Sequence, residues 1–362
     1  MRIGVLGGGP AGLYFALLAR KAMPEHEVTV IERNPSGATY GWGVVFSDRT
    51  LTSFREADFK TYSQIVERFI IWDAIDVRYR DEVVRCGGQV FSGIARKALL
   101  GLLLDRCVEL GVDLQLEREV ATVDELDGYD LVVAADGVRS ILREAHADVF
   151  RPRVVHGSSR YIWFGTTRVL DSFTFAFRSD EAGFWQAHAY PFDGETSTFI
   201  VECDAATWAR SGLDEMDDAG ATSYCEKLFE SDLRGHTLMS NNSKWIRFPT
   251  LTNSTWHHRN VVLVGDAAHT AHFSIGSGTK LAMEDSIALV NALETKADVK
   301  EALVEYQLER KPRVERFQEA ARQSQAYFET TRRFAHMEPL QFAFHLLSRS
   351  GRIDYDDLRV RD

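Results

Sequence analysis

The sequence predicts an α/β protein in which a Rossmann-like body carries an inserted antiparallel β-sheet and is followed by C-terminal helices. Three observations lead to this prediction: a strand–turn–helix–strand pattern at the start of the chain, strand patterns in its middle third, and helical periodicity from Thr279 onward. We expect residues 1–159 and 251–300 to form the body. Residues 160–250 would form the inserted substrate domain, and residues 301–362 the C-terminal helices and tail.

The first elements follow from the order of apolar runs and glycines. Met1–Leu6 is a short apolar run, a glycine cluster comes next, and Leu13–Lys21 has helical spacing. A second apolar run, Val28–Ile31, ends in Glu32. This order is typical of the opening of a doubly wound parallel sheet.

A stronger helical pattern begins near Ser92, which could cap the helix, and continues to Leu110. Gly111 suits the left-handed position just past the end of a helix. The apolar run Tyr129–Ala135 then predicts a buried strand that ends in Asp136-Gly137. These elements continue the alternation of helices and strands in the body.

The middle third has the periodicity of strands. Phe173, Phe175 and Phe177 alternate with other residues, so one face of this strand is aromatic. Further strands are predicted over Arg160–Thr166, Phe184–Tyr190, Thr196–Cys203 and, back in the body, Val261–Val264. The longest amphipathic helix is expected over Glu301–Tyr327, and the polar end Arg349–Asp362 is expected to be loosely attached.

Charge and composition exclude several classes of protein. The 362 residues include 42 basic and 53 acidic side chains, and the net charge of −11 disfavours a nucleic-acid partner, which needs a basic face. The four cysteines lack the spacing of a zinc site or a disulfide scaffold, so we expect reduced thiols and no metal. No apolar run reaches the ~20 residues of a membrane span. Because the first strand begins at Met1, we also expect no signal peptide and a cytoplasmic location.

The glycine cluster Gly7-Gly8-Gly9-Pro10-Ala11-Gly12 satisfies the GxGxxG pattern of dinucleotide-binding turns. Gly7 permits the tight turn, Gly9 lets the backbone approach a pyrophosphate, and Gly12 lets the helix lie close to the strand. Glu32 lies 20 residues beyond Gly12, where a carboxylate binds ribose hydroxyls. We therefore expect a bound dinucleotide, with Gly7, Gly9, Ala11, Gly12, Glu32 and Arg33 in contact with it; the alternative is a structural turn with a surface glutamate.

The downstream stretch Val261–His269 delivers Gly265-Asp266 from an apolar strand, and here the sequence resembles the single-component flavin aromatic hydroxylases, the group that includes 4-hydroxybenzoate hydroxylase. A second motif of that family matches Asp136-Gly137, and Arg96 falls where the family keeps an arginine beside the cofactor. The resemblance implies that the dinucleotide is FAD and that Asp266 binds its ribityl chain. The remaining cofactor contacts expected are Arg96, Val120, Asp136, Gly265, Gly276, Gly278 and Thr279.

The segment Ala271–Lys280 departs from the wider family, because His272-Phe273 replace two prolines, Ser277 replaces a glutamine and Lys280 replaces an asparagine. This variant resembles a branch of the family that acts on salicylyl-CoA and 2-aminobenzoyl-CoA. The resemblance implies that NAD(P)H, as a transient co-substrate, and O₂ are used to hydroxylate an aromatic CoA thioester, with salicylyl-CoA converted to 2,5-dihydroxybenzoyl-CoA (gentisyl-CoA). The alternatives are 2-aminobenzoyl-CoA, a tryptophan or indole substrate, a flavin dehydrogenase or reductase that adds no oxygen, and a non-catalytic FAD-binding protein.

Candidate catalytic residues are two histidines. His272 lies in the expected flavin-facing loop, and His188 lies on an aromatic strand, where its imidazole could bind or deprotonate a substrate hydroxyl. For both, a hydrogen-bonded structural histidine is the alternative. The substrate contacts expected are Trp163, Phe177, Trp185, Tyr190 and Phe273. The basic residues considered for the CoA tail are Arg78, Arg80, Arg160, Lys244 and Arg247.

Overall fold

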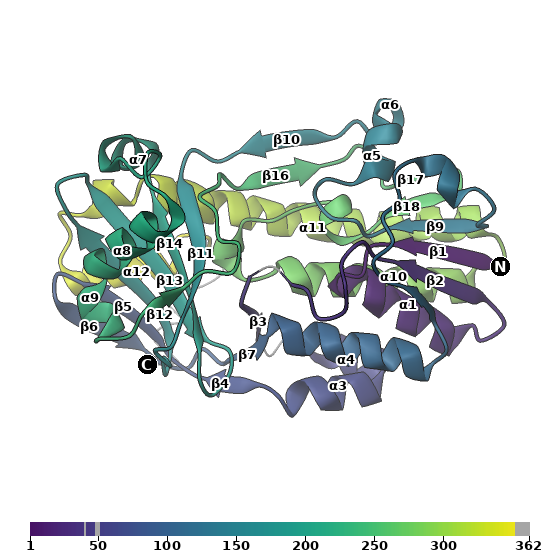
Figure 1. The fold of residues 1–362 in the computed structure, drawn as a ribbon, viewed down its shortest axis with the longest axis horizontal. Coiled ribbons are helices and arrows are strands. Elements are labelled where there is room, and N and C mark those ends of the chain that lie inside the picture. Colours follow the sequence, from purple (N-terminus) through teal and green to yellow (C-terminus); the bar gives the residue numbers. More distant parts are fainter. Residues whose placement is uncertain (40, 48–50, 352–362) are drawn as a thin grey trace.

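The computed structural model describes residues 1–39, 41–47 and 51–351 and has two lobes, each built on a β-sheet (Figure 1). The predicted α/β class, with a parallel sheet, a second sheet that is mainly antiparallel, and C-terminal helices, is confirmed. Most of the polar end expected to be loosely attached lies outside the described residues. Arg349, its first residue, is described and is held by hydrogen bonds to Ser324 and Ser274.

The first lobe contains the nucleotide-type sheet. Its six strands, in spatial order, are β17 (His257–His258), β18 (Val261–Leu263), β9 (Leu131–Ala134), β1 (Arg2–Leu6), β2 (Glu27–Ile31) and β8 (Asp113–Gln115). β17 is antiparallel to β18, and the other pairs are parallel. The helices α1 (Pro10–Ala22), α4 (Arg96–Glu109) and α10 (Gly278–Thr295) pack beside one another on this lobe. Their apolar faces and the sheet form one core.

The second lobe contains the larger sheet. Its seven strands, in spatial order, are β15 (Leu238–Met239), β11 (Arg160–Thr166), β14 (Ser197–Cys203), β13 (Phe184–Pro191), β12 (Phe173–Ser179), β5 (Ile75–Tyr79) and β6 (Glu82–Cys86). β12 pairs in parallel with β5, whereas the other pairs are antiparallel. Because β5 and β6 precede residue 160, this sheet includes strands from outside the expected insertion.

Helices cover both faces of the larger sheet. The helices α7 (Ala205–Ser211), α8 (Asp218–Leu228) and α9 (Glu230–Leu233) lie on one face, over a core that contains Trp185 and Phe199. The end of α11 (Val299–Glu329) and α12 (Pro339–Leu347) lie on the other face, where they pack against Phe175 and Phe177. All residues of β13 and β14 are buried as a result.

Other segments join the lobes. The strands β10 (Arg153–His156) and β16 (Pro249–Thr252) form a two-stranded ribbon that runs between them (Figure 1). A small sheet, β3 (Gly43–Ser47), β7 (Phe91–Ala95) and β4 (Ile70–Trp72), lies between the larger sheet and the helices α2 (Leu51–Ala57), α3 (Phe59–Val66) and α4. The short helices α5 (Ile141–Ala145) and α6 (Ala147–Phe150) precede the ribbon. The chain therefore passes between the lobes several times.

The predicted start of the helix that ends near Leu110 was wrong. Ser92 does not cap a helix, because Phe91–Ala95 is a strand that pairs with both β3 and β4. The helix begins only at Arg96, and Gly111 beyond its end has the expected left-handed conformation, with φ of 73°. The close packing of β7 explains the difference: a Cβ on Gly93 would lie 2.4 Å from the carbonyl oxygen of Pro191.

In the part of the chain that the structure describes, no helix combines the length and apolar character needed to cross a membrane. All four cysteines are buried, and their thiols are free of disulfide bonds.

Candidate active site

A cavity of about 570 Å³, here called the inner cavity, lies between the two lobes. The glycine turn, the start of α4 and the start of α10 line it on the side of the first lobe. Strands β11, β12, β13 and β14 of the larger sheet line the opposite side. Segments that are far apart in the sequence therefore meet around one space.

The glycine turn has the geometry that an approaching phosphate requires. Gly7 has a φ of 108°, and a Cβ there would lie 2.4 Å from the carbonyl oxygen of Ala135. A Cβ on Gly9 would meet nothing within 4 Å, so the backbone at Gly9 opens directly onto the inner cavity. A Cβ on Gly12 would lie 2.0 Å from the carbonyl oxygen of Gly7, which shows how closely α1 approaches the turn. Ala11 also lines the cavity.

Asp266 directs a carboxylate into the same space. The preceding Gly265 has a φ of 57°. A Cβ there would lie 3.0 Å from the Cβ of Ala11 and 3.1 Å from the Cβ of Ala282, so the starts of α1 and α10 both pack closely against this glycine. The side chain of Asp266 is exposed to the cavity that it lines. The protein that surrounds the carboxylate at the bottom of the cavity desolvates it and raises the pKa of Asp266, an effect that His269 and Arg96 reduce.

Arg96 is a cationic group on the first-lobe side of the cavity wall. It is the first residue of α4, its backbone N–H donates to the carbonyl oxygen of Trp42, and its side chain faces Asp266 and Tyr190. Burial lowers the pKa of Arg96, while Asp266 opposes that change. A half-buried guanidinium beside a carboxylate can bind an oxygen-rich ligand without leaving a buried charge unpaired.

The start of α10 completes the polar side of the cavity. Gly276, with a φ of 59°, Gly278 and Thr279 line it together with Ser277. The N-termini of α1 and α10 therefore both reach the cavity, and helix N-termini favour anions. Two such helix ends, an open glycine backbone and a carboxylate fit the pyrophosphate and the hydroxyl-bearing chain of FAD.

Besides Gly7, Gly12 and Gly265, which shape the turns next to the inner cavity, four predicted cofactor residues do not line it. Glu32 accepts hydrogen bonds from the backbone N–H groups of Gly8, at 2.7 Å, and Asn34, at 2.8 Å. Arg33 is exposed, and Val120 is buried in the core of the first lobe. Asp136 accepts a hydrogen bond from the backbone of Ile141 at the start of α5, while Gly137 beside it lines the cavity. Their contacts with a cofactor stay predictions.

Aromatic side chains form the wall that faces the polar groups. Trp163, Tyr190 and Phe273, three of the predicted substrate contacts, line the inner cavity, and Tyr161 and Phe173 join them. The ring centroids of Tyr161 and Phe273 are 4.7 Å apart, and the Tyr190 hydroxyl donates to the carbonyl oxygen of Gly43 at 3.0 Å. These contacts fix the wall as a rigid, largely apolar surface.

Two of the predicted substrate contacts do not line this cavity. Phe177 packs against Tyr79 and Phe342 in the core beneath α12. Trp185 lies on the opposite face of the sheet, against Tyr224 and beneath α8. The alternation of a strand separates its two faces but does not reveal which buried face borders a ligand.

His188 lies on the cavity side of β13 and lines the cavity. Its Nε2 is 3.0 Å from Oε2 of Glu202, and both side chains are buried. Burial lowers the pKa of His188 to about 3, and Arg349 contributes to the shift, so the imidazole is neutral. A neutral imidazole can accept a proton from a ligand hydroxyl.

His272 does not have the placement expected of it, because it does not line the inner cavity. Its ring contacts Phe248 and Phe273, which do line the cavity, so His272 lies behind them. The Nδ1 atom is 2.8 Å from the hydroxyl of Ser274 and also accepts from the backbone N–H of Ser274. The side chain of His272 thus caps the short turn Phe273–Ile275.

A buried network holds the Asp266 loop, and two of its members, Asp285 and Arg310, were not predicted from the sequence. Asp285 accepts hydrogen bonds from the backbone N–H of Gly265 and from Nε of Arg310, and its Oδ2 is 2.7 Å from Nε2 of His269. Burial alone would raise the pKa of Asp285, but His269 and Arg310 together lower it. Asp285 stands out in the sequence as a carboxylate within the apolar run of α10. Nothing in the sequence, however, indicates that Arg310 on α11 pairs with it.

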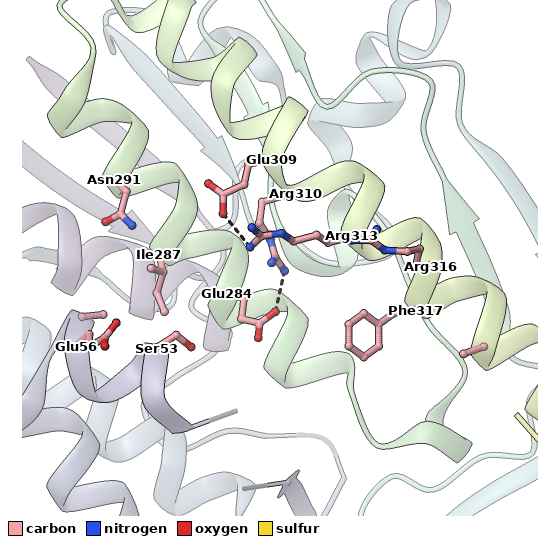
Figure 2. Close-up of a pocket in the computed structure, with 12 residues that line it drawn as sticks. Ser53, Glu56, Glu284, Ile287, Asn291, Glu309, Arg310, Arg313, Arg316 and Phe317 are labelled. Atoms are coloured by element: carbon pink, nitrogen blue, oxygen red, sulfur yellow. Dashed lines mark hydrogen bonds and ion pairs between the residues drawn. The ribbon is translucent and has the colours of Figure 1, made fainter. Parts of the chain in front are cut away.

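A second, outer groove of about 700 Å³ lies on the other side of α10, between α2 and α11 (Figure 2). Two ion pairs lie in this groove: Arg310 of α11 pairs with Glu284 of α10 at 3.1 Å, and Arg313 pairs with Glu309 along α11 at 3.0 Å (Figure 2). Glu284 lines this groove, whereas Ala282, on the same helix, lines the inner cavity. The outer groove shares no lining residue with the inner cavity and contains none of the residues predicted to bind the cofactor.

Comparisons with known proteins agree with this arrangement. A family model described as an FAD binding domain matches residues 1–321. The chain is 44% identical over 373 residues to a salicyloyl-CoA 5-hydroxylase of a Streptomyces species, covering 100% of this chain and 72% of the relative. It is 36% identical to a 3-hydroxy-4-methyl-anthranilyl-(aryl-carrier protein) 5-monooxygenase of Streptosporangium sibiricum, covering 99% and 97%. The solved structure of p-nitrophenol 4-monooxygenase from Pseudomonas putida has the same fold, with a TM-score of 0.78 at 16% identity over 99% and 95% of the two chains.

Proposed function

The chain belongs to the FAD-dependent aromatic monooxygenases, and from this premise we propose that it hydroxylates the ring of an aromatic CoA thioester, converting salicylyl-CoA to 2,5-dihydroxybenzoyl-CoA. One observation carries the proposal: a single cavity is lined on one side by the glycine turn, Arg96 and Asp266 and on the other by aromatic side chains. An aromatic ring and a flavin would therefore face each other. The 44% identity to a salicyloyl-CoA 5-hydroxylase supports the choice of ring and thioester.

The residues of the first lobe would hold the cofactor. FAD, when bound and reduced by NAD(P)H, supplies the activation of O₂ and the transfer of oxygen. The open backbone at Gly9 and the helix ends fit its pyrophosphate, and Asp266 fits the hydroxyls of its ribityl chain. Arg96 would lie beside Asp266 and balance its charge.

The aromatic wall would hold the ring. Trp163, Phe173 and Tyr190 of the second lobe, with Phe273 from the loop before α10, can enclose a benzene ring and exclude water from it. Neutral His188 would accept a hydrogen bond from the ring hydroxyl, which orients the ring and makes its para carbon more electron-rich. We do not assign His272 a direct role in this step, because Phe248 and Phe273 separate it from the cavity.

The CoA tail requires a polar exit from the cavity. Of the five basic residues considered from the sequence, Lys244 lines the cavity, next to Asn241 and Asn242. The ion pair of Lys244 with Asp218 is exposed on both sides, so its ammonium group is accessible to a phosphate. Arg78, in contrast, pairs with buried Asp232.

A second candidate substrate is a thioester of the same kind of ring on a carrier protein. It is supported by the 36% identity to a monooxygenase whose name specifies an aryl-carrier protein, over nearly the full length of both chains. The polar mouth at Lys244 would then face the phosphopantetheine arm instead of the nucleotide of CoA.

The test compares NAD(P)H oxidation and incorporation of labelled oxygen with salicylyl-CoA, 2-aminobenzoyl-CoA, free salicylate, tryptophan and a salicylyl-carrier protein. We expect the rate of hydroxylation with salicylyl-CoA to be well above that with the other compounds.

Lys244→Ala should raise KM for salicylyl-CoA about 3- to 10-fold, because one charge-assisted contact is lost, and should leave kcat unchanged. The matched control Lys296→Ala removes another surface lysine, which follows the last residue of α10 and does not line the cavity, and it should change neither constant. Oxidation of NAD(P)H without oxygen in the product would contradict the proposal.

A further inference from the structure

A buried imidazole–carboxylate pair lies against the aromatic wall of the inner cavity. Nε2 of His188 and Oε2 of Glu202 are 3.0 Å apart, and each side chain is about 1% exposed. The two residues lie on neighbouring antiparallel strands, where Glu202 is directly opposite Gln186. His188 lines the cavity and Glu202 does not, so Glu202 is one step further from a ligand.

Two polar atoms of this pair lack a hydrogen-bond partner among the described residues. They are Nδ1 of His188 and Oε1 of Glu202. Buried polar atoms are nearly always hydrogen-bonded in folded proteins, and exceptions gather where a ligand binds. Because Nε2 of His188 is committed to Glu202, Nδ1 is the ring nitrogen that remains for a hydroxyl in the cavity.

The surroundings of Glu202 allow it to change its protonation state near neutral pH. Burial raises the pKa of Glu202 to about 7, and Glu329 on α11 adds to the shift. Three groups oppose the shift: His272 behind the cavity, Gln186 on β13 and Ser159 before β11. Glu202 therefore takes up and releases a proton in the pH range in which an enzyme works.

The surroundings of His188 disfavour a charged imidazole. Its ring contacts Phe175, Phe273 and Phe328, with centroids 5.3, 5.4 and 4.5 Å away. The guanidinium of Arg349 lies 4.7 Å from the Phe328 ring, and its positive charge lowers the pKa of His188 further. An imidazolium would therefore be costly here.

We propose that Glu202 accepts the hydroxyl proton of the substrate through His188, an inference that rests on the proposed hydroxylation of a phenolic ring. The substrate O–H bond breaks as an N–H bond forms at Nδ1 of His188. The N–H bond at Nε2 breaks as an O–H bond forms at Oε2 of Glu202. The imidazole ends as its other neutral tautomer, and the negative charge of the carboxylate moves to the substrate oxygen. No oxidant or reductant takes part.

The pairing with Glu202 avoids the formation of a charged imidazole at His188. A single histidine base would become an imidazolium inside a cage of phenylalanines and near Arg349. With Glu202 behind it, His188 passes the proton on and never carries a charge. Glu202 acts through His188, so its effect should appear in the ionisation of the bound ring.

The experiment measures the ionisation of a coloured ligand on the FAD-loaded enzyme. The probe is 5-nitrosalicyl-CoA, in which the nitro group blocks the carbon that we propose to be hydroxylated and colours the phenolate. Difference spectra across a pH series give the ionisation midpoint of the bound probe. We expect the midpoint in Glu202→Gln to lie at least one pH unit above the wild-type midpoint, which is a tenfold change in the ionisation constant. His188→Asn should give the same shift and serves as the second variant if Glu202→Gln fails to fold.

The matched control is Glu329→Gln, which removes a nearby carboxylate that does not contact His188. Its midpoint should stay within about 0.3 pH units of the wild type, since a carboxylate that acts only through its charge and passes no proton should have an effect below about 0.5 kcal/mol. In turnover, Glu202→Gln should lower kcat about 100-fold, remove the rise of kcat with pH, and change KM less than threefold. Equal midpoints in the wild type and Glu202→Gln would overturn the inference.

A parallel titration with 4-nitrophenol separates this inference from the proposed substrate class. If the CoA probe does not bind the wild type but 4-nitrophenol does, the thioester assignment fails, and the midpoints with 4-nitrophenol still decide the role of Glu202. If both probes bind and ionise alike in every variant, the role of Glu202 fails while the thioester assignment stands.

Discussion

Replacing Gly12 by alanine should disrupt both the stability of the first lobe and its ability to hold FAD. An added Cβ would lie 2.0 Å from the carbonyl oxygen of Gly7 and 3.2 Å from the Cβ of Ala135. The first contact is with backbone, which cannot rotate away as a side chain can. The start of α1 would have to move instead, and this is the segment that opens onto the inner cavity.

The size of the effect follows from the overlap. A carbon and a carbonyl oxygen normally approach to roughly 3.4 Å, so α1 must shift by about 1.4 Å where it now touches the turn. Overpacking of this kind costs about 3 kcal/mol or more. A displacement of that size also removes the backbone N–H groups from a pyrophosphate, and we expect the affinity for FAD to fall more than tenfold.

Gly101→Ala is the matched control, because it makes the same substitution inside another helix of the same lobe. A Cβ on Gly101 would meet nothing within 4 Å. Alanine is the better helix former by about 0.5 to 1 kcal/mol, so this variant should be slightly more stable than the wild type. The two variants should thus differ by roughly 4 kcal/mol in opposite directions.

Urea unfolding followed by tryptophan fluorescence measures the stability, and flavin absorbance of the purified protein measures occupancy. The reasoning would be refuted if Gly12→Ala had wild-type stability and full flavin occupancy. It would also be refuted if Gly101→Ala lost as much of both as Gly12→Ala.

Three further predictions test other parts of the site. Asp266→Ala should weaken FAD binding more than tenfold in a flavin-fluorescence titration, because its carboxylate opens onto the cavity. The unfolding free energy should change by less than about 1 kcal/mol. Undiminished FAD binding would contradict this prediction. Asp285→Asn should lower the unfolding free energy by about 3 to 5 kcal/mol, since it leaves Arg310 buried without its main partner. Glu284→Gln, which removes the less buried partner of Arg310, should cost no more than about 1 kcal/mol, and equal losses would argue against the network. The pKa of Glu202, about 7 in the folded protein, lies above the ~4.3 of an exposed glutamate, so its stabilising effect is complete below pH ~4.3 and is lost as the pH rises through 7. The unfolding free energy of the wild type should therefore fall by roughly 3 kcal/mol more than that of Glu202→Gln between pH 5 and pH 8, and parallel curves would contradict this.

Local patterns in the sequence predicted much of the fold. The strands expected at Arg160–Thr166, Phe184–Tyr190 and Thr196–Cys203 agree with β11, β13 and β14 to within one residue at each end. The start of α4 could not be predicted in the same way. Ile94 and Ala95 fit the apolar spacing of the helix that follows, but Phe91–Ala95 is a strand because β3 and β4 pair with it from both sides.

The site was only partly predictable for a related reason. The glycine turn and Asp266 are encoded in short motifs, and both face the inner cavity. Trp185 could not be assigned, because both faces of β13 are buried and the pattern does not show which one borders a ligand. Glu202 was visible as the one charged residue in the apolar run Ser197–Cys203, but its importance depends on a neighbour from another strand.

The long helix α11 has a consequence for how substrate enters and leaves. Its 31 residues span about 46 Å. Leu303 and Tyr306 near its start belong to the core of the first lobe, whereas Tyr327 and Phe328 near its end belong to the core beneath α12. The helix is therefore anchored in both lobes. A rotation of one lobe relative to the other would expose buried side chains at one of its ends. We therefore expect a ring to exchange through local displacement of surface segments around the mouth, with the two lobes keeping a fixed angle throughout the reaction cycle.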